Sequence, residues 1–207
     1  MAFRIEAAVI VVFAQSLFGA VEVEHRHLHG GSPGMLEVTD QGIEYTEISK
    51  TAKHNRRWKY EEIQQLELSD SSLRILTYEP HNREFVFDRL PKGFADRVYP
   101  MWKDKLDQRF VAGVADPDVK TLEEFRVKGG TLLFGEDRIV LRGKESRTWR
   151  FSDIENIASA GPFDLSIVTF ERHGLWKAEG REFRFQLQRP MEEARFNDLW
   201  RRVTRVR

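Results

Sequence analysis

The sequence predicts a mainly β protein with some α-helix (α+β), built as two tandem units that each end in a closing amphipathic helix. Three observations lead to this prediction: an internal repeat, short segments with a two-residue apolar period, and two apolar stripes at helical spacing. The chain has 207 residues, of which 41% are hydrophobic and 12% aromatic. A chain of that size and composition can form two small hydrophobic cores.

The repeat is clearest around two tryptophans. The segment from Trp58 to Leu66 (WKYEEIQQL) matches the segment from Trp149 to Ile157 (WRFSDIENI) at a constant offset. Further blocks match in the same order, and the offset changes only between blocks, as it does when loops gain or lose residues. These blocks are 34–36 with 130–132, 73–79 with 165–171, 84–87 with 182–185, and 98–102 with 196–200. The repeat therefore predicts a duplicated domain.

Each unit is predicted to begin with strands and to end with a helix. Residues 43–46 and 84–87 alternate in polarity, which is typical of half-buried strands. The helical stripe of the first unit contains Phe94, Val98, Trp102, Leu106 and Phe110. The stripe of the second unit contains Phe196, Leu199, Trp200 and Val203. We expect burial of Trp58 and Trp149 at one pair of equivalent positions, and of Trp102 and Trp200 at another.

The N-terminal segment has a different character. Residues 7–20 (AAVIVVFAQSLFGA) are mostly apolar, follow Arg4, and are shorter than the roughly 20 residues that span a bilayer. This pattern predicts a signal peptide at 1–20 and an exported protein, periplasmic or secreted. An uncleaved anchor and a core element are the alternatives. The remaining boundaries are predicted as 21–111 for the first unit, 112–119 for a linker and 120–207 for the second unit.

The short antiparallel strands, the Trp-x-aromatic-x-acid-Ile step at Trp58–Ile63 and Trp149–Ile154, and the closing helix resemble the pleckstrin-homology-like (PH-like) fold. The resemblance is closest to the bacterial and GRAM-like versions of that fold. It implies two tandem PH-like barrels or sandwiches, each with an open end covered by a helix. It also implies binding of lipids, peptides or proteins rather than catalysis, although a fold does not fix a function.

Composition and motifs narrow the function classes. The 33 Lys and Arg residues balance the 33 Asp and Glu residues, so no global positive field favours nucleic acid. The absence of cysteine excludes disulfides, thiolate catalysis and Cys-ligated zinc. The sequence contains no phosphate-binding loop, nucleophile elbow, dinucleotide-binding motif or zinc-protease motif. We expect no enzyme activity, no catalytic residues and no cofactor.

Two loops are the candidate ligand-binding segments. The first carries Lys50, Lys53, Arg56 and Arg57 and would suit an anion, because Lys and Arg are strong donors to phosphate and carboxylate. The second carries an aromatic among cations, Arg172, Trp176 and Lys177, and would suit a partner pocket or a membrane interface. Both loops are equally compatible with solvated turns.

The spacing of His25, His27 and His29 makes them a weak candidate for a metal site. Residues two apart share one face of a strand, and imidazole binds zinc and copper. Their spacing along an extended strand, about 6.6 Å between neighbours, is too wide for one ion, so a polar edge strand is favoured.

The predicted function is an exported, non-catalytic module that binds a protein or peptide through loops and sheet edges. The alternative is peripheral binding to an anionic lipid or membrane surface through Lys50, Lys53, Arg56 and Arg57. Neutral net charge and the lack of matching basic loops in the two units favour the first of these.

Overall fold

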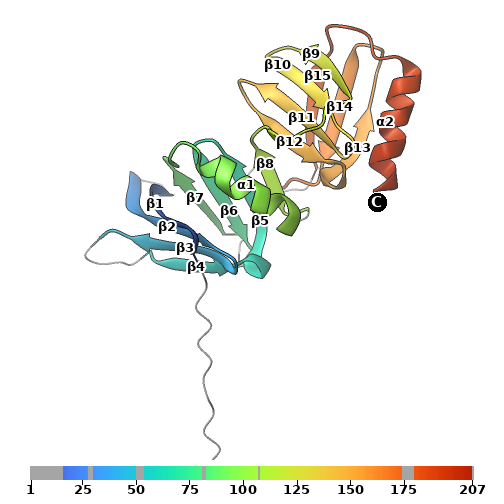
Figure 1. Ribbon diagram of the computed structural model, residues 1–207. Coiled ribbons are helices and arrows are strands. Elements are labelled where there is room, and N and C mark those ends of the chain that lie inside the picture. The colour runs from blue at the N-terminus through green and yellow to red at the C-terminus, as the bar shows by residue number, and fades with distance from the viewer. Residues whose placement is uncertain are drawn as a thin grey trace, which may run out of the picture.

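The computed structural model describes residues 16–27, 30–49, 54–80, 83–106, 108–173 and 180–206. The first half contains β1 (Ser16–His27), β2 (Gly30–Thr39), β3 (Gly42–Glu47), β4 (Arg56–Lys59), the 3-10 helix η1 (Tyr60–Glu62), β5 (Ile63–Ser69), β6 (Ser72–Thr77), β7 (Glu84–Asp88) and α1 (Phe94–Lys105). Strand β8 (Phe110–Gly113) follows it and lies where the two lobes in Figure 1 meet.

The second half repeats the order of the first. It contains β9 (Glu123–Val127), β10 (Gly130–Phe134), β11 (Arg138–Gly143), β12 (Arg147–Arg150), the 3-10 helix η2 (Phe151–Asp153), β13 (Ile154–Ala158), β14 (Asp164–Thr169), β15 (Arg181–Gln186) and α2 (Glu193–Arg205). The mainly β character with two α-helices is therefore confirmed.

The strands form one large open sheet and one small sheet. The large sheet has 12 strands in the order β4-β3-β2-β1-β7-β6-β5-β8-β12-β11-β10-β9, and β8 runs parallel to β5 while its other neighbour β12 is antiparallel. The small sheet has the order β13-β14-β15. Neither half closes into a barrel within the described residues, so the expectation of barrels is corrected to one large open mixed sheet with a separate three-stranded sheet.

Each half has its own hydrophobic core. The first is built around Trp58, Phe87 and Trp102, and the second around Phe125, Trp149 and Leu199. Trp58 and Trp149 are each the third residue of the strand that precedes a 3-10 helix, and both are buried as expected. In both places a carboxylate of the 3-10 helix, from Glu62 or Asp153, accepts the backbone N–H at the turn, because short helices leave such donors unpaired.

Two expectations about the helices are wrong. Helix α1 ends at Lys105, so Phe110 lies in β8, and the left-handed φ of 54° at Gln108 reverses the chain between them. Trp102 is fully buried, but Trp200 is 45% exposed. The buried stripe of α2 runs through Leu199 and Val203, which places Trp200 at its edge rather than at its centre.

The structure also bears on the expected boundaries. Strand β1 already begins at Ser16, and residues 16–20 lie in the part of it that pairs with the end of β2. Residues 1–15 lie outside the described residues, so the signal peptide stays a prediction. The expected linker at 112–119 begins inside β8 and includes Asp116, which is completely buried. In the described part of the chain, neither α-helix has the length and apolar character needed to cross a membrane.

Candidate functional site

A groove of about 460 Å³ lies at one end of the second half, where the β9–β10 and β11–β12 turns meet the start of β15. We call it the turn-end groove. Its floor is aromatic, with Trp149, Phe183 and Phe185. Its rim is mostly cationic, with Lys128, Lys144, Arg147, Arg181 and Arg184 against the single acid Glu145. An apolar floor with a charged rim is the usual composition of a binding site.

The floor follows from the two-residue period of β15. Phe183 and Phe185 share one face of the strand and are half-buried, whereas Glu182, Arg184 and Gln186 on the other face are exposed. The ring centroids of Phe183 and Phe185 lie 5.0 Å and 6.0 Å from that of the buried Trp149. The partly exposed phenyl rings therefore offer apolar surface to the groove on a rigid base.

Two of the cations hold the floor in place. The Nη2 atom of Arg147 lies 2.9 Å from Oε2 of Glu171, and Nη1 of Arg181 lies 3.6 Å from the same oxygen. Both guanidinium groups also lie against the Phe183 ring, 4.8 Å and 4.7 Å from its centroid. Burial raises the pKa of the Glu171 carboxyl, and the two guanidinium groups oppose that rise by favouring the carboxylate.

The free positive charge at the rim comes from two lysines. Arg184 pairs with Glu182 at 2.8 Å, so it is partly neutralised. Lys128 and Lys144 are exposed on the two turns, and no carboxylate among the described residues pairs with either. The groove therefore combines apolar contact in its floor with about two unneutralised positive charges at its edge.

The equivalent end of the first half carries a cluster of imidazoles instead. The ring centroids of His25 and His27 lie 4.4 Å apart, and that of His54 lies 4.8 Å from His27 and 6.5 Å from His25. His27 Nε2 lies 3.0 Å from the Ser32 hydroxyl, and His54 Nδ1 lies 3.2 Å from Glu47 Oε2. His54 joins this cluster from a separate element, because it lies between β3 and β4 rather than on β1.

His25 is the buried member of this cluster. It is 7% exposed, and its Nδ1 atom has no hydrogen-bond partner in the described structure. Burial, followed by the neighbouring His27 and His54, lowers the pKa of His25 to about 4. Within the described ranges, no group of three or more His, Asp or Glu side chains is arranged to hold a metal ion. His29 lies outside those ranges.

The remaining predicted site residues are dispersed. Arg56 and Arg57 are neighbours in β4 and therefore point to opposite faces; Arg57 Nε forms an ion pair with Glu44 at 2.9 Å. Arg172 is tied to the first half through its backbone, which donates to Gln65 Oε1 at 2.6 Å and accepts from Gln65 Nε2 at 3.1 Å. Lys50, Lys53, Trp176 and Lys177 lie outside the described residues, so their binding role stays a prediction.

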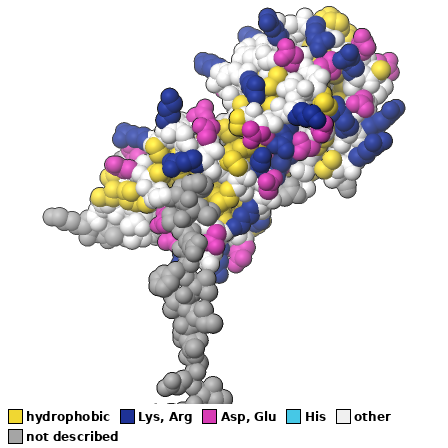
Figure 2. Space-filling view, viewed as in Figure 1, with side chains coloured by type: hydrophobic (Ala, Val, Ile, Leu, Met, Phe, Trp, Pro, Cys, Tyr) yellow, Lys and Arg dark blue, Asp and Glu magenta, His cyan; other side chains and the backbone are white. Residues whose placement is uncertain are grey.

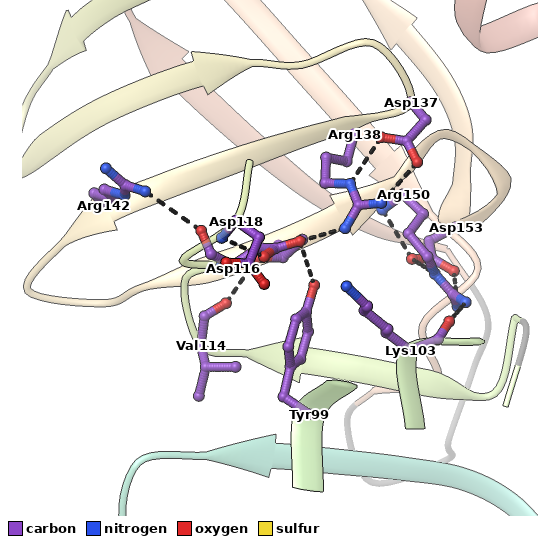
Figure 3. Close-up of polar contacts among 11 residues, drawn as sticks. Tyr99, Lys103, Val114, Asp116, Asp118, Asp137, Arg138, Arg142, Arg150 and Asp153 are labelled. Atoms are coloured by element: carbon purple, nitrogen blue, oxygen red, sulfur yellow. Dashed lines mark hydrogen bonds and ion pairs between the residues drawn. The ribbon is translucent and has the colours of Figure 1, made fainter. Parts of the chain in front are cut away.

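The two halves are joined by a buried polar network around Asp116 (Figure 3). Asp116 accepts a hydrogen bond of 3.0 Å from the hydroxyl of Tyr99 on α1 and forms an ion pair with Arg138 on β11. Burial and then the Asp116 carboxylate raise the pKa of Tyr99. Arg150 of β12 donates to the backbone oxygen of Lys103 on α1. The network links a helix of one half to two strands of the other.

A second contact between the halves lies near the turn-end groove. Arg147 Nη2 lies 3.6 Å from Glu67 Oε1 on β5, in addition to its pair with Glu171. The β8 strand adds backbone pairing to both β5 and β12. The groove is thus supported by residues of both halves, which fixes its floor relative to the first half.

Sequence reasoning identified neither the rim lysines nor the floor aromatics as a site. Two features of the sequence carry this information. Aromatic residues alternate with polar or charged residues from Arg181 to Gln186, and a separate turn at Lys128–Gly129–Gly130 carries a lysine. These features become informative only when the fold brings β15 beside the β9–β10 turn. Over the face shown in Figure 2, Lys and Arg side chains are interspersed with Asp and Glu, which agrees with the neutral net charge.

Comparison with known proteins gives limited similarity. No family model matches the chain, and no curated protein matches it. Among solved structures, the chain is similar to one described as the Spt16D Pob3N heterodimer. That similarity has a TM-score of 0.34 at 12% identity and covers 84% of this chain and 99% of that one. It carries no inference about function.

Proposed function

We propose that the chain is a non-catalytic binding module of two tandem PH-like units, and that the turn-end groove binds a protein partner through a peptide segment. The observation that carries the proposal is the combination of a half-buried aromatic floor with two unneutralised lysines at its rim. The tandem PH-like assignment is supported by the order of elements, since each half has seven strands with a 3-10 helix after the fourth and an α-helix at its end.

The balance of charge favours a peptide over a lipid phosphate. A phosphomonoester, as on a phosphorylated lipid headgroup, carries about two negative charges and is held by several cationic donors at once. Here Arg147, Arg181 and Arg184 already pair with Glu171 or Glu182, which leaves Lys128 and Lys144. Apolar or aromatic side chains with one or two carboxylates match that arrangement better. Export of the protein and ligand binding by the basic segment Lys50–Arg57 remain expectations from the sequence, and the proposal does not depend on either.

The test is selection of peptides from a random twelve-residue display library on the full-length protein. We expect enriched peptides that combine aromatic or aliphatic residues with Asp or Glu. Lys128→Glu/Lys144→Glu should weaken their binding tenfold or more. The matched control Lys92→Glu/Arg201→Glu makes the same change of charge at exposed cations away from the groove and should leave binding unchanged.

Sedimentation with vesicles tests whether an anionic membrane, rather than a peptide, is the ligand of the turn-end groove; the predicted membrane site at Lys50, Lys53, Arg56 and Arg57 is tested separately by changing those four residues to alanine. Vesicles of phosphatidylglycerol should not bind the protein at physiological salt, because surface charges are screened beyond about 8 Å there. Salt-sensitive vesicle binding that Lys128→Glu/Lys144→Glu abolishes, with no enriched peptide, would replace the peptide by an anionic membrane as the ligand.

A further inference from the structure

The structure points to how a partner segment would bind: we infer that an extended peptide adds as a strand to the free edge of β15, between two hollows. This inference rests on the proposed function and goes beyond it by naming the edge, the backbone conformation and the side-chain pattern of the partner. It follows from three features of the described residues: the pairing of β15, the hollows on its two faces and the charge of its surroundings.

The first feature is that, among the strands of the described residues, β15 is paired along one side only. It pairs with β14 from Arg181↔Thr169 to Gln186↔Asp164, and it is the last strand of its sheet. In the first half the equivalent strand β7 pairs with β1 through Glu24↔Asp88 and His25↔Phe87. Within the described residues, the equivalent pairing of β9 with β15 is missing from the second half.

The reason for the missing pairing is a shorter hairpin: β1 pairs with β2 as far as His27↔Gly30, four residues beyond the Val23↔Gly34 pair, whereas β9 and β10 end at the equivalent pair, Val127↔Gly130. Strand β9 meets the chain only beyond β15, at the isolated bridge Val127↔Leu187. Antiparallel partners run in opposite directions, so residues before Leu187 lie past the C-terminal end of β9, where the chain turns at Lys128 and Gly129. The edge of β15 from Arg181 to Phe185 therefore extends beyond β9, and its outward N–H and C=O groups can accept a further strand.

The second feature is that a hollow lies on each face of this edge. The turn-end groove lies over the face with Phe183 and Phe185. A second hollow of about 610 Å³ lies over the other face and extends across the sheet from Glu182 and Gln186 of β15 to Ala158 at the end of β13. Side chains of an added strand point alternately to the two faces, so one set would point toward the groove and the other set toward the β15 side of the second hollow.

The third feature is charge, which decides the chemistry of the partner. The groove on the aromatic face is rimmed by Lys128 and Lys144, so it suits aromatic or aliphatic side chains with an acid at the end that approaches the turns. The other hollow is lined by polar side chains of both signs, including Asp164 and Arg184, and suits neutral polar residues. The partner is thus an extended segment of alternating apolar and polar residues that ends in Asp or Glu.

The edge also carries charges of its own, as exposed edges do to prevent aggregation. A second copy of the chain is therefore a poor occupant. Pairing of two β15 edges would bring two copies of the same rim, each with five cations and one acid, to one interface. A peptide with acidic residues brings the opposite charge to the same rim, which is why we infer a peptide and not a dimer.

The test uses the peptide enriched most strongly by selection on the full-length protein, synthesised with its backbone unchanged or N-methylated at every second residue. An added strand bonds to its neighbour through alternate residues. N-methylation of one set of amides should therefore lower the affinity tenfold or more, while N-methylation of the other set should change it less than threefold. The protein itself is unaltered, so misfolding cannot mimic the effect.

The outcomes separate the two proposals. If no peptide is enriched, the proposed binding function fails. If a peptide is enriched but both N-methylated forms bind as well as the parent, the function stands and strand addition is overturned. Sedimentation equilibrium of the protein alone should give the monomer mass at micromolar concentration. A stable dimer that excludes the peptide would show that a second copy occupies the edge, which also overturns the inference.

Discussion

The two halves share an order of elements but differ at the end where their turns lie. In the first half β1 pairs with β7, and the turn end is filled by His25, His27 and His54. In the second half β9 meets this part of the chain only at the bridge Val127↔Leu187, and the turn end carries an aromatic floor with lysines at its rim. The backbone pairing of one strand thus decides whether the end of the scaffold is closed by its own side chains or is left available to a partner.

The helices differ in the same way. Trp102 of α1 is buried, and its Nε1 atom donates a hydrogen bond of 3.0 Å to the Tyr60 hydroxyl. The residue equivalent to Tyr60 is Phe151, which has no hydroxyl, and Trp200 of α2 is 45% exposed. The half that has the Tyr60 hydroxyl therefore buries its helix tryptophan, Trp102, and the half that lacks this hydroxyl leaves Trp200 partly exposed. Four predictions test how far this difference between the halves extends.

The largest expected effect is at the helix position itself. Trp102→Ala should lower the free energy of unfolding by about 4 kcal/mol, because it removes a fully buried indole and leaves a cavity. Trp200→Ala should lower it by less than about 1 kcal/mol, since almost half of that side chain is in water already. Urea unfolding followed by circular dichroism measures both. Equal losses would show that the two tryptophans are equivalent after all.

The second prediction separates the halves. Asp116→Ala should cost about 3 kcal/mol, because it leaves the Arg138 guanidinium without its buried carboxylate and removes the acceptor of Tyr99. Calorimetry should then show two transitions in place of one, since the network links α1 to β11. Asp118→Ala is the matched control: it changes an exposed side chain, and its backbone N–H still donates to Asp116. A single cooperative transition in Asp116→Ala would mean that β8 alone couples the halves.

The third prediction concerns pH and the buried imidazole of the first half. The His25 ring packs against those of Phe85 and Phe87, so phenylalanine is an apolar replacement of similar size at this place. The pKa of His25 is about 4 in the folded protein and about 6.5 in the unfolded chain, so the unfolded chain binds the proton more readily. Stability should therefore fall as the pH falls from about 6.5 to about 4, and this group should add no further loss below that range.

The size of this loss should be about 2 kcal/mol, which is less than the full shift corresponds to, since the cluster lies at an open end where water screens charge. His25→Phe should flatten the pH dependence of the free energy of unfolding in that window. The same substitution at the exposed His173 is the control and should leave the slope as it is. An unchanged slope in His25→Phe would assign the pH dependence to other groups.

The parts of the fold that sequence predicted are those fixed by local pattern. The matching segments Trp58–Ile63 and Trp149–Ile154 are recognisable from their residue pattern alone. In the structure both form a strand, a 3-10 helix and the start of the next strand. The exposure of Trp200 was not found, because a four-residue spacing fits both the centre and the edge of a helical stripe. The turn-end groove was missed for a further reason. It depends on the register between β9 and the segment after β15, which are about 60 residues apart and have no local signal.

The smallest effect concerns the hydroxyl that distinguishes the two cores. Tyr60→Phe gives the first half the residue of the second. It removes the acceptor of Trp102 Nε1 and the donor to the Thr39 backbone oxygen at 2.9 Å, so it should cost about 1 kcal/mol. The reverse substitution, Phe151→Tyr, should not stabilise the second half, because Trp200 lies outside the core and cannot bond to the new hydroxyl. Urea unfolding of both variants, with tryptophan fluorescence as a second signal, measures the two effects. A gain in stability for Phe151→Tyr, together with a blue shift of the emission, would mean that Trp200 can turn inward once a partner is present. The difference between the halves would then depend on that one oxygen and not on the path of α2.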